Sequence, residues 1–357
     1  CGGVECVSKT VSSPTLICLP VPIMARYRSI TLCIDNVFVN QVGFFLSISR
    51  DIHFITTEAI VNRKEPTLTA CLKNVYKAYL QRGFRITHVN ADLESECCRG
   101  FIVTDLRAML NIAGEDEHVP EMKRCIRTVK ERTRCTYNVL PFERYPPKLL
   151  IEMVFLSLFW LNAFPNKQGI SRTISPRTIV TGKQIDYRTH CRVEFGQYVQ
   201  THKKHNNLMV TQTVGTLALR ATDNAQGGYY FYSLATGRRL NQTHWTELPM
   251  PAEVKDRVHA LARRANAKRG LTFTDSDGRN LDELYPEADD DNDSDYDPDD
   301  DDDASYASSE DSDYDPDDDG STDDHSSTAS TDELQQHPDL TAPQPAENAG
   351  LDYDSRA

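Results

Sequence analysis

The stretch Ile30-Thr31-Leu32-Cys33-Ile34-Asp35-Asn36-Val37-Phe38-Val39 decides the fold. It is apolar and rich in β-branched and aromatic side chains, which is typical of a buried strand. A second run of this kind, at 84–92, ends in Asp92. A carboxylate in a buried strand is costly unless a cation or a proton compensates its charge. The two aspartates therefore predict a site where neighbouring strands gather carboxylates around a divalent cation.

The rest of the N-terminal half continues this pattern of strands and helices. Apolar runs bounded by turn residues predict strands, and an apolar period of 3.6 residues predicts helices. Strands are expected at 42–49 and 53–57, and helices at 67–81, near 105–111, at 120–138 and at 146–162. Three strands, a helix, a fourth strand and further helices, in this order, predict an α/β fold with an RNase H-like mixed sheet core.

A bridge rich in proline, glycine and serine, which begins at Pro165, separates a second region from the first. The segments expected to form strands in this region are 192–199, 216–219, 228–232 and 243–246. Short strands separated by turn residues are typical of a small β-barrel. A basic helix is expected after the last of these strands, within 251–270.

Charge is segregated along the chain. The net charge is −14, yet residues 281–357 hold 29 Asp and Glu against one basic residue, Arg356, while the remainder carries +14. A basic body indicates a polyanionic partner such as nucleic acid. The acidic segment contains Asp-Ser-Asp-Tyr-Asp-Pro-Asp-Asp twice, at 293–300 and 311–318. We expect this segment to be a disordered tail because it cannot bury enough apolar surface to fold.

Cysteine usage and hydropathy favour an intracellular protein. The ten cysteines include no Cys-x-x-Cys pair, which favours reduced thiols over a disulfide framework. The chain begins at Cys1, as expected for a fragment, and lacks the basic start and apolar core of a secretory signal. The most apolar window, 149–161, contains Glu152 and is too short to span a bilayer. We therefore expect a nuclear or cytoplasmic protein without membrane contact.

A basic helix motif follows the second aspartate. Arg124, Arg127 and Thr128 have the spacing of the Glu-Arg-x-x-Arg-Thr helix found in integrases of copia-type retrotransposons. The interval of 57 residues between Asp35 and Asp92 is similar to that between the first two metal ligands of such integrases. In this combination the chain resembles the integrase segment of a copia-type retrotransposon polyprotein.

Two landmarks farther along the chain extend the resemblance. Residues 173–182 look like the bridge that follows copia-type catalytic cores, and residues 231–238 resemble a hairpin of the SH3-like barrel beyond it. The domain organisation that follows is a linker at 1–25, an RNase H-like integrase catalytic core at 26–164, a linker at 165–183, an SH3-like β-barrel at 184–250, a basic helix at 251–270 and a disordered acidic tail at 281–357.

The resemblance implies Mg²⁺- or Mn²⁺-dependent phosphoryl transfer that joins element DNA ends to target DNA. Asp35 and Asp92 would be the metal ligands, and Glu121 is the nearest candidate for a third catalytic carboxylate. Double-stranded DNA is the expected partner and a homo-oligomer the expected assembly, and no small-molecule substrate is expected. The residues expected to contact DNA share one basic helix: Lys123, Arg124, Arg127, Lys130 and Arg134.

The third carboxylate departs from the family pattern. Lys123 stands where the motif has its glutamate, and an ammonium group cannot bind Mg²⁺. Glu121 lies two positions earlier, about 200° around a helix. An active integrase and a catalytically decayed, non-enzymatic DNA-binding remnant both stay open. A third interpretation makes the acidic tail the main interaction module.

Overall fold

The computed structural model describes residues 16–114, 119–202, 211–222, 224 and 227–284. Residues 1–287 form one compact unit, and residues 288–357 form a second unit that lies outside the described residues. The predicted disorder of the acidic tail from residue 285 onward also falls outside them. Within the described part of the chain, no helix is both long and apolar enough to cross a membrane.

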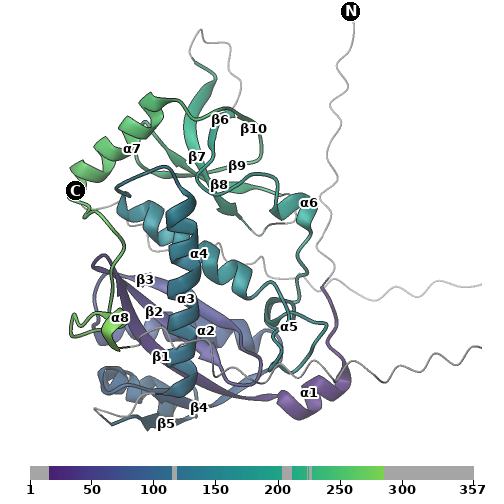
Figure 1. Cartoon of the computed structure of the whole chain (residues 1–357). Helices are drawn as coiled ribbons and strands as arrows, with labels where there is room; N and C mark the ends of the chain where they lie inside the picture. Colours follow the sequence, from purple (N-terminus) through teal and green to yellow (C-terminus); the bar gives the residue numbers. More distant parts are fainter. Residues whose placement is uncertain (1–15, 115–118, 203–210, 223, 225–226, 285–357) are drawn as a thin grey trace, which may run out of the picture. The chain divides into compact units, whose positions relative to one another are not determined.

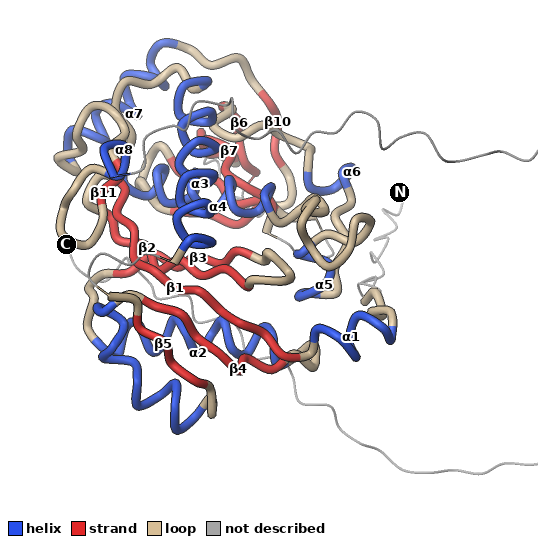
Figure 2. Tube along the Cα trace, turned by 60° about the horizontal axis from the view of Figure 1, so that its bottom comes forward, coloured by secondary structure: helices blue, strands red, loops and turns tan. Residues whose placement is uncertain are grey.

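A mixed sheet forms the core of the first unit, with the strand order β3-β2-β1-β4-β5 (Figure 2). Its strands are β1 (Ser29–Val39), β2 (Val42–Ser49), β3 (Ile55–Ile60), β4 (Arg85–Ala91) and β5 (Met109–Ile112). The first three strands pair antiparallel, whereas β4 runs parallel to both β1 and β5. The predicted mixed α/β core is confirmed.

Side chains alternate between the two faces of this sheet, and each face is covered by different helices. Leu32 and Ile34 pack in the cluster that contains α2 (Glu65–Leu80). Cys33 packs on the other face with α3 (Pro120–Val139) and α4 (Pro147–Leu161). Asp35 has the parity of Cys33, so the strand directs its carboxylate toward α3.

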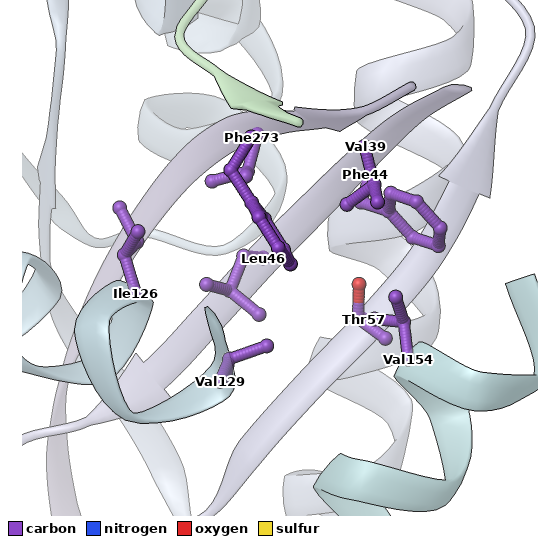
Figure 3. Close-up of a pocket in the computed structure, with 9 residues that line it drawn as sticks. Val39, Phe44, Leu46, Thr57, Ile126, Val129, Val154 and Phe273 are labelled. Carbon is purple, nitrogen blue, oxygen red and sulfur yellow. The ribbon is translucent and has the colours of Figure 1, made fainter. Parts of the chain in front are cut away.

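A small cavity of about 20 Å³ lies between the sheet and α3 (Figure 3). Its lining residues are Val37, Val39, Phe44, Leu46, Thr57, Ile126, Val129, Val154 and Phe273. A cavity of this volume could hold at most one water molecule, and an apolar lining offers a water no partners. This cavity is therefore a packing defect and not a ligand site.

Two elements differ from the sequence-based expectation. Residues 109–112, expected in a short helix, form the edge strand β5, preceded by a wide helical turn at Phe101–Asp105. Arg107 takes a left-handed conformation (φ 54°) that breaks the helix before the strand begins. In the segment expected to be a linker, Val21–Tyr27 forms helix α1. The backbone just before α1 is held in place, because the carbonyl oxygen of Ile17 accepts a hydrogen bond from the Arg82 side chain at 2.8 Å.

A second, antiparallel sheet has the order β10-β6-β7-β8-β9. Its strands are β6 (Tyr198–His202), β7 (Thr213–Ala221), β8 (Tyr229–Ser233), β9 (Arg239–Gln242) and β10 (Trp245–Glu247). Gly237 adopts φ 69° in the β8–β9 turn, a conformation that glycine adopts without strain. The strands predicted at 216–219, 228–232 and 243–246 overlap β7, β8 and β10, whereas the strand predicted at 192–199 begins only at Tyr198 and β9 was not predicted. Among the described residues, the pairing that would close them into a barrel, between β9 and β10, is absent.

Helix α4 connects the two sheets, because it contacts β3 of the first and β7 of the second (Figure 1). Its buried Glu152 receives Arg220 Nε at 2.8 Å and Arg239 Nη1 at 2.7 Å. Both guanidinium groups also lie over the ring of Tyr230. A buried carboxylate on the core thus holds two arginines of the second sheet.

The chain returns to the first sheet after helix α7 (Ala252–Arg264). The two-residue strand β11 (Phe273–Thr274) pairs with the end of β1, and α8 (Leu281–Leu284) follows it. Asn40 fixes this return, since its side chain bonds Gly270 O and Thr272 N, each at 2.8 Å. Sequence periodicity could not reveal this contact, because two residues are too few to show a period.

Candidate functional site

The parallel pairing of β1 and β4 brings the two predicted aspartates together. Cys33 pairs with Asn90 and Ile34 with Ala91, so the next step of the register sets Asp35 beside Asp92. Residues paired in this way project from the same face of a sheet. Asp35 and Asp92 therefore lie side by side on the α3 face, where β4 ends.

The carboxyl group of Asp35 reflects this neighbourhood. Burial, followed by the charge of Asp92, raises the pKa of Asp35 to about 8, with further contributions from Glu94 and Asp275. The backbone N–H of Asn36 donates to Asp35 Oδ1 at 2.6 Å and opposes this rise. A pKa raised by neighbouring carboxylates is a feature of functional carboxylate pairs.

Two residues that sequence reasoning missed border the aspartate pair. Glu94 accepts a hydrogen bond from Asn36 Nδ2 at 3.0 Å and forms an ion pair with Arg63. Arg63 also donates to Ser276 O at 3.0 Å, which ties the loop after β11 to this corner. The sequence could suggest Glu94, which follows Asp92 closely. It held no signal for Arg63, because that contact spans distant segments.

Helix α3 runs along β1 and exposes two different flanks. Burial raises the pKa of Cys33 to about 11 and Glu121 adds to the rise, so Glu121 lies near Cys33. Cys125, one turn later, is buried close to both Cys33 and Asp35. Glu121 Oε1 forms an ion pair of 2.7 Å with Arg50 Nε, next to the end of β2. Its second oxygen is buried without a hydrogen-bond partner among the described residues.

The opposite flank of α3 is basic. Lys123, Arg127, Lys130 and Arg134 fall within about 60° of one another around the helix. Lys130 Nζ lies 2.7 Å from Asp282 Oδ1, and Arg134 pairs with the same carboxylate. This flank therefore faces α8 and β11, on the side of β1 away from Arg50.

These positions correct the expectation for Lys130 and show the surroundings of Glu121. Lys130 is 1% exposed and paired with Asp282, so it cannot contact a DNA phosphate in this fold. Glu121 points to Arg50, on the flank opposite Lys123. Glu121 is engaged by Arg50 in this fold, and its role as a third catalytic carboxylate stays a prediction.

The Mg²⁺ or Mn²⁺ implied by the resemblance can be tested against the groups present. Within the described residues, no cluster of three or more His, Cys, Asp or Glu side chains is arranged to hold a metal ion. Mg²⁺ needs near-octahedral oxygen ligands, and the motif position that would supply the third carboxylate is Lys123. The side chains do not fit the implied three-carboxylate centre.

Replacing Asp282 by asparagine is expected to lower the free energy of unfolding by about 1 kcal/mol, because the buried Lys130 would lose its carboxylate partner. Burial opposes ionisation, but hydrogen bonds from Arg134 and Lys130 hold the pKa of Asp282 below its ordinary value. The stabilisation is therefore present above about pH 4 and is lost as the pH falls further. Urea unfolding at pH 7 and pH 3 measures both effects.

The matched control is Asp277→Asn, because Asp277 pairs with Arg279 but is 65% exposed at its side chain. That variant should unfold within about 0.3 kcal/mol of the parent. Equal losses for the two variants would contradict the fastening role of Asp282.

Comparisons with known proteins add the following. No protein-family model matches the sequence, and no curated protein matches it. The catalytic core domain of BIV integrase aligns with 42% of this chain and 92% of its own, at 16% identity and a TM-score of 0.32. A chain of the simian T-cell lymphotropic virus intasome in complex with PP2A regulatory subunit B56 gamma covers 62% of this chain and 82% of its own, at 10% identity and a TM-score of 0.32. Scores this low carry no argument, so fold and function rest on the strand pairing and residues above.

Proposed function

We propose that this chain is an integrase-like, RNase H-fold protein that binds duplex DNA and has lost strand-transfer activity. The observation that carries the proposal is the parallel register of β1 and β4, which brings Asp35 and Asp92 together near a helix with one basic flank. A phosphoryl-transfer site would retain such a pair of carboxylates. The site is incomplete because a lysine, Lys123, holds the motif position of the third carboxylate.

The strand order supports the RNase H-like part of the proposal. An antiparallel β1-β2-β3 meander, a helix, and then β4 and β5 added parallel on the far side of β1 match the element order expected for such a core. The copia-like motifs at 124–128, 173–182 and 231–238 fall on α3, on the segment that contains helix α5 (Pro176–Thr181) and on the β8 hairpin. An SH3-like second domain and homo-oligomerisation belong to the same proposal.

DNA binding is supported by charge. Residues 1–280 carry a net charge of +14, and lysines and arginines that contact phosphates release counterions from DNA. On α3, Arg124 is exposed, and its guanidinium group donates one hydrogen bond within the described part of the chain, to Gln168 Oε1 at 3.2 Å. Arg127 is half-buried, and its Nε has no hydrogen-bond partner among the described residues. Backbone contacts of this kind give affinity with little sequence preference.

The loss of catalysis follows from the ligand set. Two-metal phosphoryl transfer needs carboxylates that hold both ions in a fixed geometry. Asp35 and Asp92 could contribute to such a centre, but among the described residues no three His, Cys, Asp or Glu side chains are arranged to hold a metal ion. The remaining residues bind and orient DNA without activating a nucleophile.

Lys123→Glu tests this proposal. The parent should show no detectable strand transfer with Mn²⁺, while the variant should bind Mg²⁺ at least about tenfold more tightly, because it gains a hard oxygen ligand and loses a cation. Titration calorimetry measures the metal, and an oligonucleotide-joining assay measures the activity. Lys77→Glu, at an exposed position of α2, is the control for net charge.

Duplex DNA binding is measured in parallel as a function of salt. The dissociation constant of the parent should rise steeply between 50 and 200 mM salt, by roughly a hundredfold or more if several phosphates are contacted. Robust strand transfer by the parent would overturn the loss of catalysis. Salt-independent or undetectable DNA binding would overturn the DNA-binding function itself.

A further inference from the structure

Five basic side chains gather where α7 ends, and we call them the α7 cationic surface. They are Arg144, Arg263, Arg264, Lys268 and Arg269. All five residues are exposed, and they come from two segments more than a hundred residues apart. Their meeting is therefore a property of the fold and not of the local sequence.

The register of α7 directs its last two arginines away from the core. The buried residues of this helix recur at intervals of four and are Val254, Val258 and Ala262. Arg263 and Arg264 follow in the last turn, outside this buried stripe. Asn266 then takes a left-handed conformation (φ 52°) just beyond the helix end. The segment 263–269 thus presents four cations, two on each side of this turn.

The second segment is held against α7 by specific contacts. The backbone N–H of Glu143 donates to His259 Nε2 at 3.1 Å. Arg144 and Arg269 form an isolated antiparallel bridge. Because these contacts fix the backbone, Arg144 cannot move away from Arg269 to reduce their mutual repulsion.

Little negative charge lies close to this surface. Arg269 Nη2 lies 2.6 Å from Glu143 Oε2, and both side chains are about two-thirds exposed, so this pair is weak. Among the described residues, the side chains of the other four cations have no hydrogen-bond or ion-pair partner. The acidic residues of α7, Glu253 and Asp256, lie at its start, about 10 Å of helix before Arg263. Five cations against one carboxylate leave a net charge of +4.

Two ordinary explanations account for only part of this charge. The helix dipole favours cations in the last turn of α7, but it explains neither Arg144 nor Lys268. A solvated face would separate like charges, whereas the backbone bridge holds Arg144 beside Arg269. The arrangement therefore indicates an anionic ligand.

The chemistry of the surface favours a phosphate polyanion over a protein partner. Four of the five cations are arginines, whose planar guanidinium groups pair bidentately with phosphate oxygens. The exposed large apolar side chains of the described residues include none within 141–145 or 251–270, and a protein interface needs such anchors. A second copy of this chain would meet the surface with a basic body, since residues 1–280 carry +14, and would be repelled.

We propose that the α7 cationic surface is a second binding site for the phosphate backbone of duplex DNA, separate from α3. This inference rests on the proposed DNA-binding function and adds a site to it. The Tyr145 hydroxyl donates to Tyr137 O at 2.8 Å, so the neighbouring Arg144 lies near the end of α3. Arg124 lies near the start of that helix, 13 residues before Tyr137, which is roughly 20 Å of helix. Each site can therefore be altered without the other.

The salt dependence of DNA binding tests the α7 site. Each phosphate contact contributes about −0.9 to the slope of log K against log salt. Arg263→Gln/Arg264→Gln should therefore make the slope shallower by about 1.8 and raise the dissociation constant at 50 mM salt at least about tenfold. Arg144→Gln, in the other segment, should change the slope by about 0.9. Fluorescence anisotropy of the full chain with a duplex of about 30 base pairs measures both quantities between 50 and 300 mM salt.

The matched control is Arg28→Gln/Arg85→Gln, which removes the same charge at two exposed arginines at the start of β1 and β4. Its slope should stay within about 0.3 of the parent value. Equal urea midpoints for all variants establish that each is folded. Because phosphate contacts carry no sequence information, the losses should be the same for two duplexes of unrelated sequence.

Acetylation of lysines gives a second measurement, on the unmodified protein. Duplex DNA at 50 mM salt should protect Lys268 from acetylation at least about fivefold, and Lys77, exposed on α2, is the internal reference that should stay reactive. Poly-glutamate at the same concentration of charge should protect Lys268 much less, because carboxylates on a flexible chain lack the fixed spacing of duplex phosphates.

Three outcomes would overturn the proposal, and they differ in what else they overturn. Salt-dependent DNA binding that the changes at 263, 264 and 144 leave unaltered would remove the α7 site while the proposed function stands. Equal protection of Lys268 by poly-glutamate and by DNA would make the surface a general polyanion site. A parent protein that does not bind duplex DNA at 50 mM salt would overturn the proposed function together with this inference.

Discussion

Glu152→Gln is expected to lower the free energy of unfolding by about 3 kcal/mol, the largest loss of any single change considered for this chain. Glu152 is 4% exposed and receives Arg220 and Arg239 from the second sheet. Removing its charge leaves two guanidinium groups close together without a counter-charge. Arg177 adds to the problem, because burial and the charge of Arg220 already lower its pKa to about 10.

Urea unfolding at pH 7 measures this effect, and Glu143→Gln is the matched control. Glu143 also pairs with an arginine, but both partners are about two-thirds exposed, so its loss should change stability by less than about 0.5 kcal/mol. The urea concentration at the midpoint of unfolding should fall equally for the second sheet and for the first sheet, because α4 contacts both. A Glu152→Gln protein as stable as the control variant would show that the ion pairs of Glu152 with Arg220 and Arg239 make no net contribution to stability.

Asp35→Asn is expected to raise the free energy of unfolding at pH 7 by about 2 kcal/mol, the largest gain. The carboxyl of Asp35 has a pKa of about 8 in the fold and about 3.9 in the unfolded chain. Between these values the unfolded chain releases a proton that the folded chain keeps, so folding becomes less favourable as the pH rises. Asparagine has no proton to release and removes the repulsion with Asp92.

Thermal unfolding from pH 3 to pH 9 tests this prediction. The difference between variant and parent should be near zero below pH 4, grow up to about pH 8 and then stay constant. Asp256→Asn, at an exposed position on α7, should show no such growth. A destabilised Asp35→Asn protein at pH 8 would mean that the carboxylate is compensated in the fold, and the proposed incomplete site would need revision.

The sequence predicted those parts of the fold that local pattern determines. The apolar run at 30–39 and the helical period at 120–138 correspond to β1 and α3 within one or two residues. The pairing of Asp35 with Asp92 could be anticipated because one long strand contains an aspartate and a later apolar run ends in one. Strand β5 was mistaken for a helix because four residues are too few to distinguish the two periods.

The candidate site was predicted less completely, for a different physical reason. The angle of about 200° between Glu121 and Lys123 follows from helix geometry alone. Which of the two faces Asp35 depends on how α3 is rotated on the sheet, and this rotation is fixed by Arg50 and by Asp282. Asp282 lies more than 150 residues after Lys123, in a segment that was assigned to the tail. Information of this kind is tertiary and leaves no local signal.

The return of β11 to β1 has a consequence for how this chain is made. The side chain of Asn40 can form its hydrogen bond to Gly270 O only after Gly270, 230 residues later in the chain, has been synthesised. At 5–20 residues per second, a ribosome needs roughly ten to fifty seconds to synthesise that interval. Throughout this time the end of β1 is an open edge, able to pair with any other nascent strand. Premature termination before residue 273 would make that exposure permanent, so shortened products of this chain should be prone to aggregation.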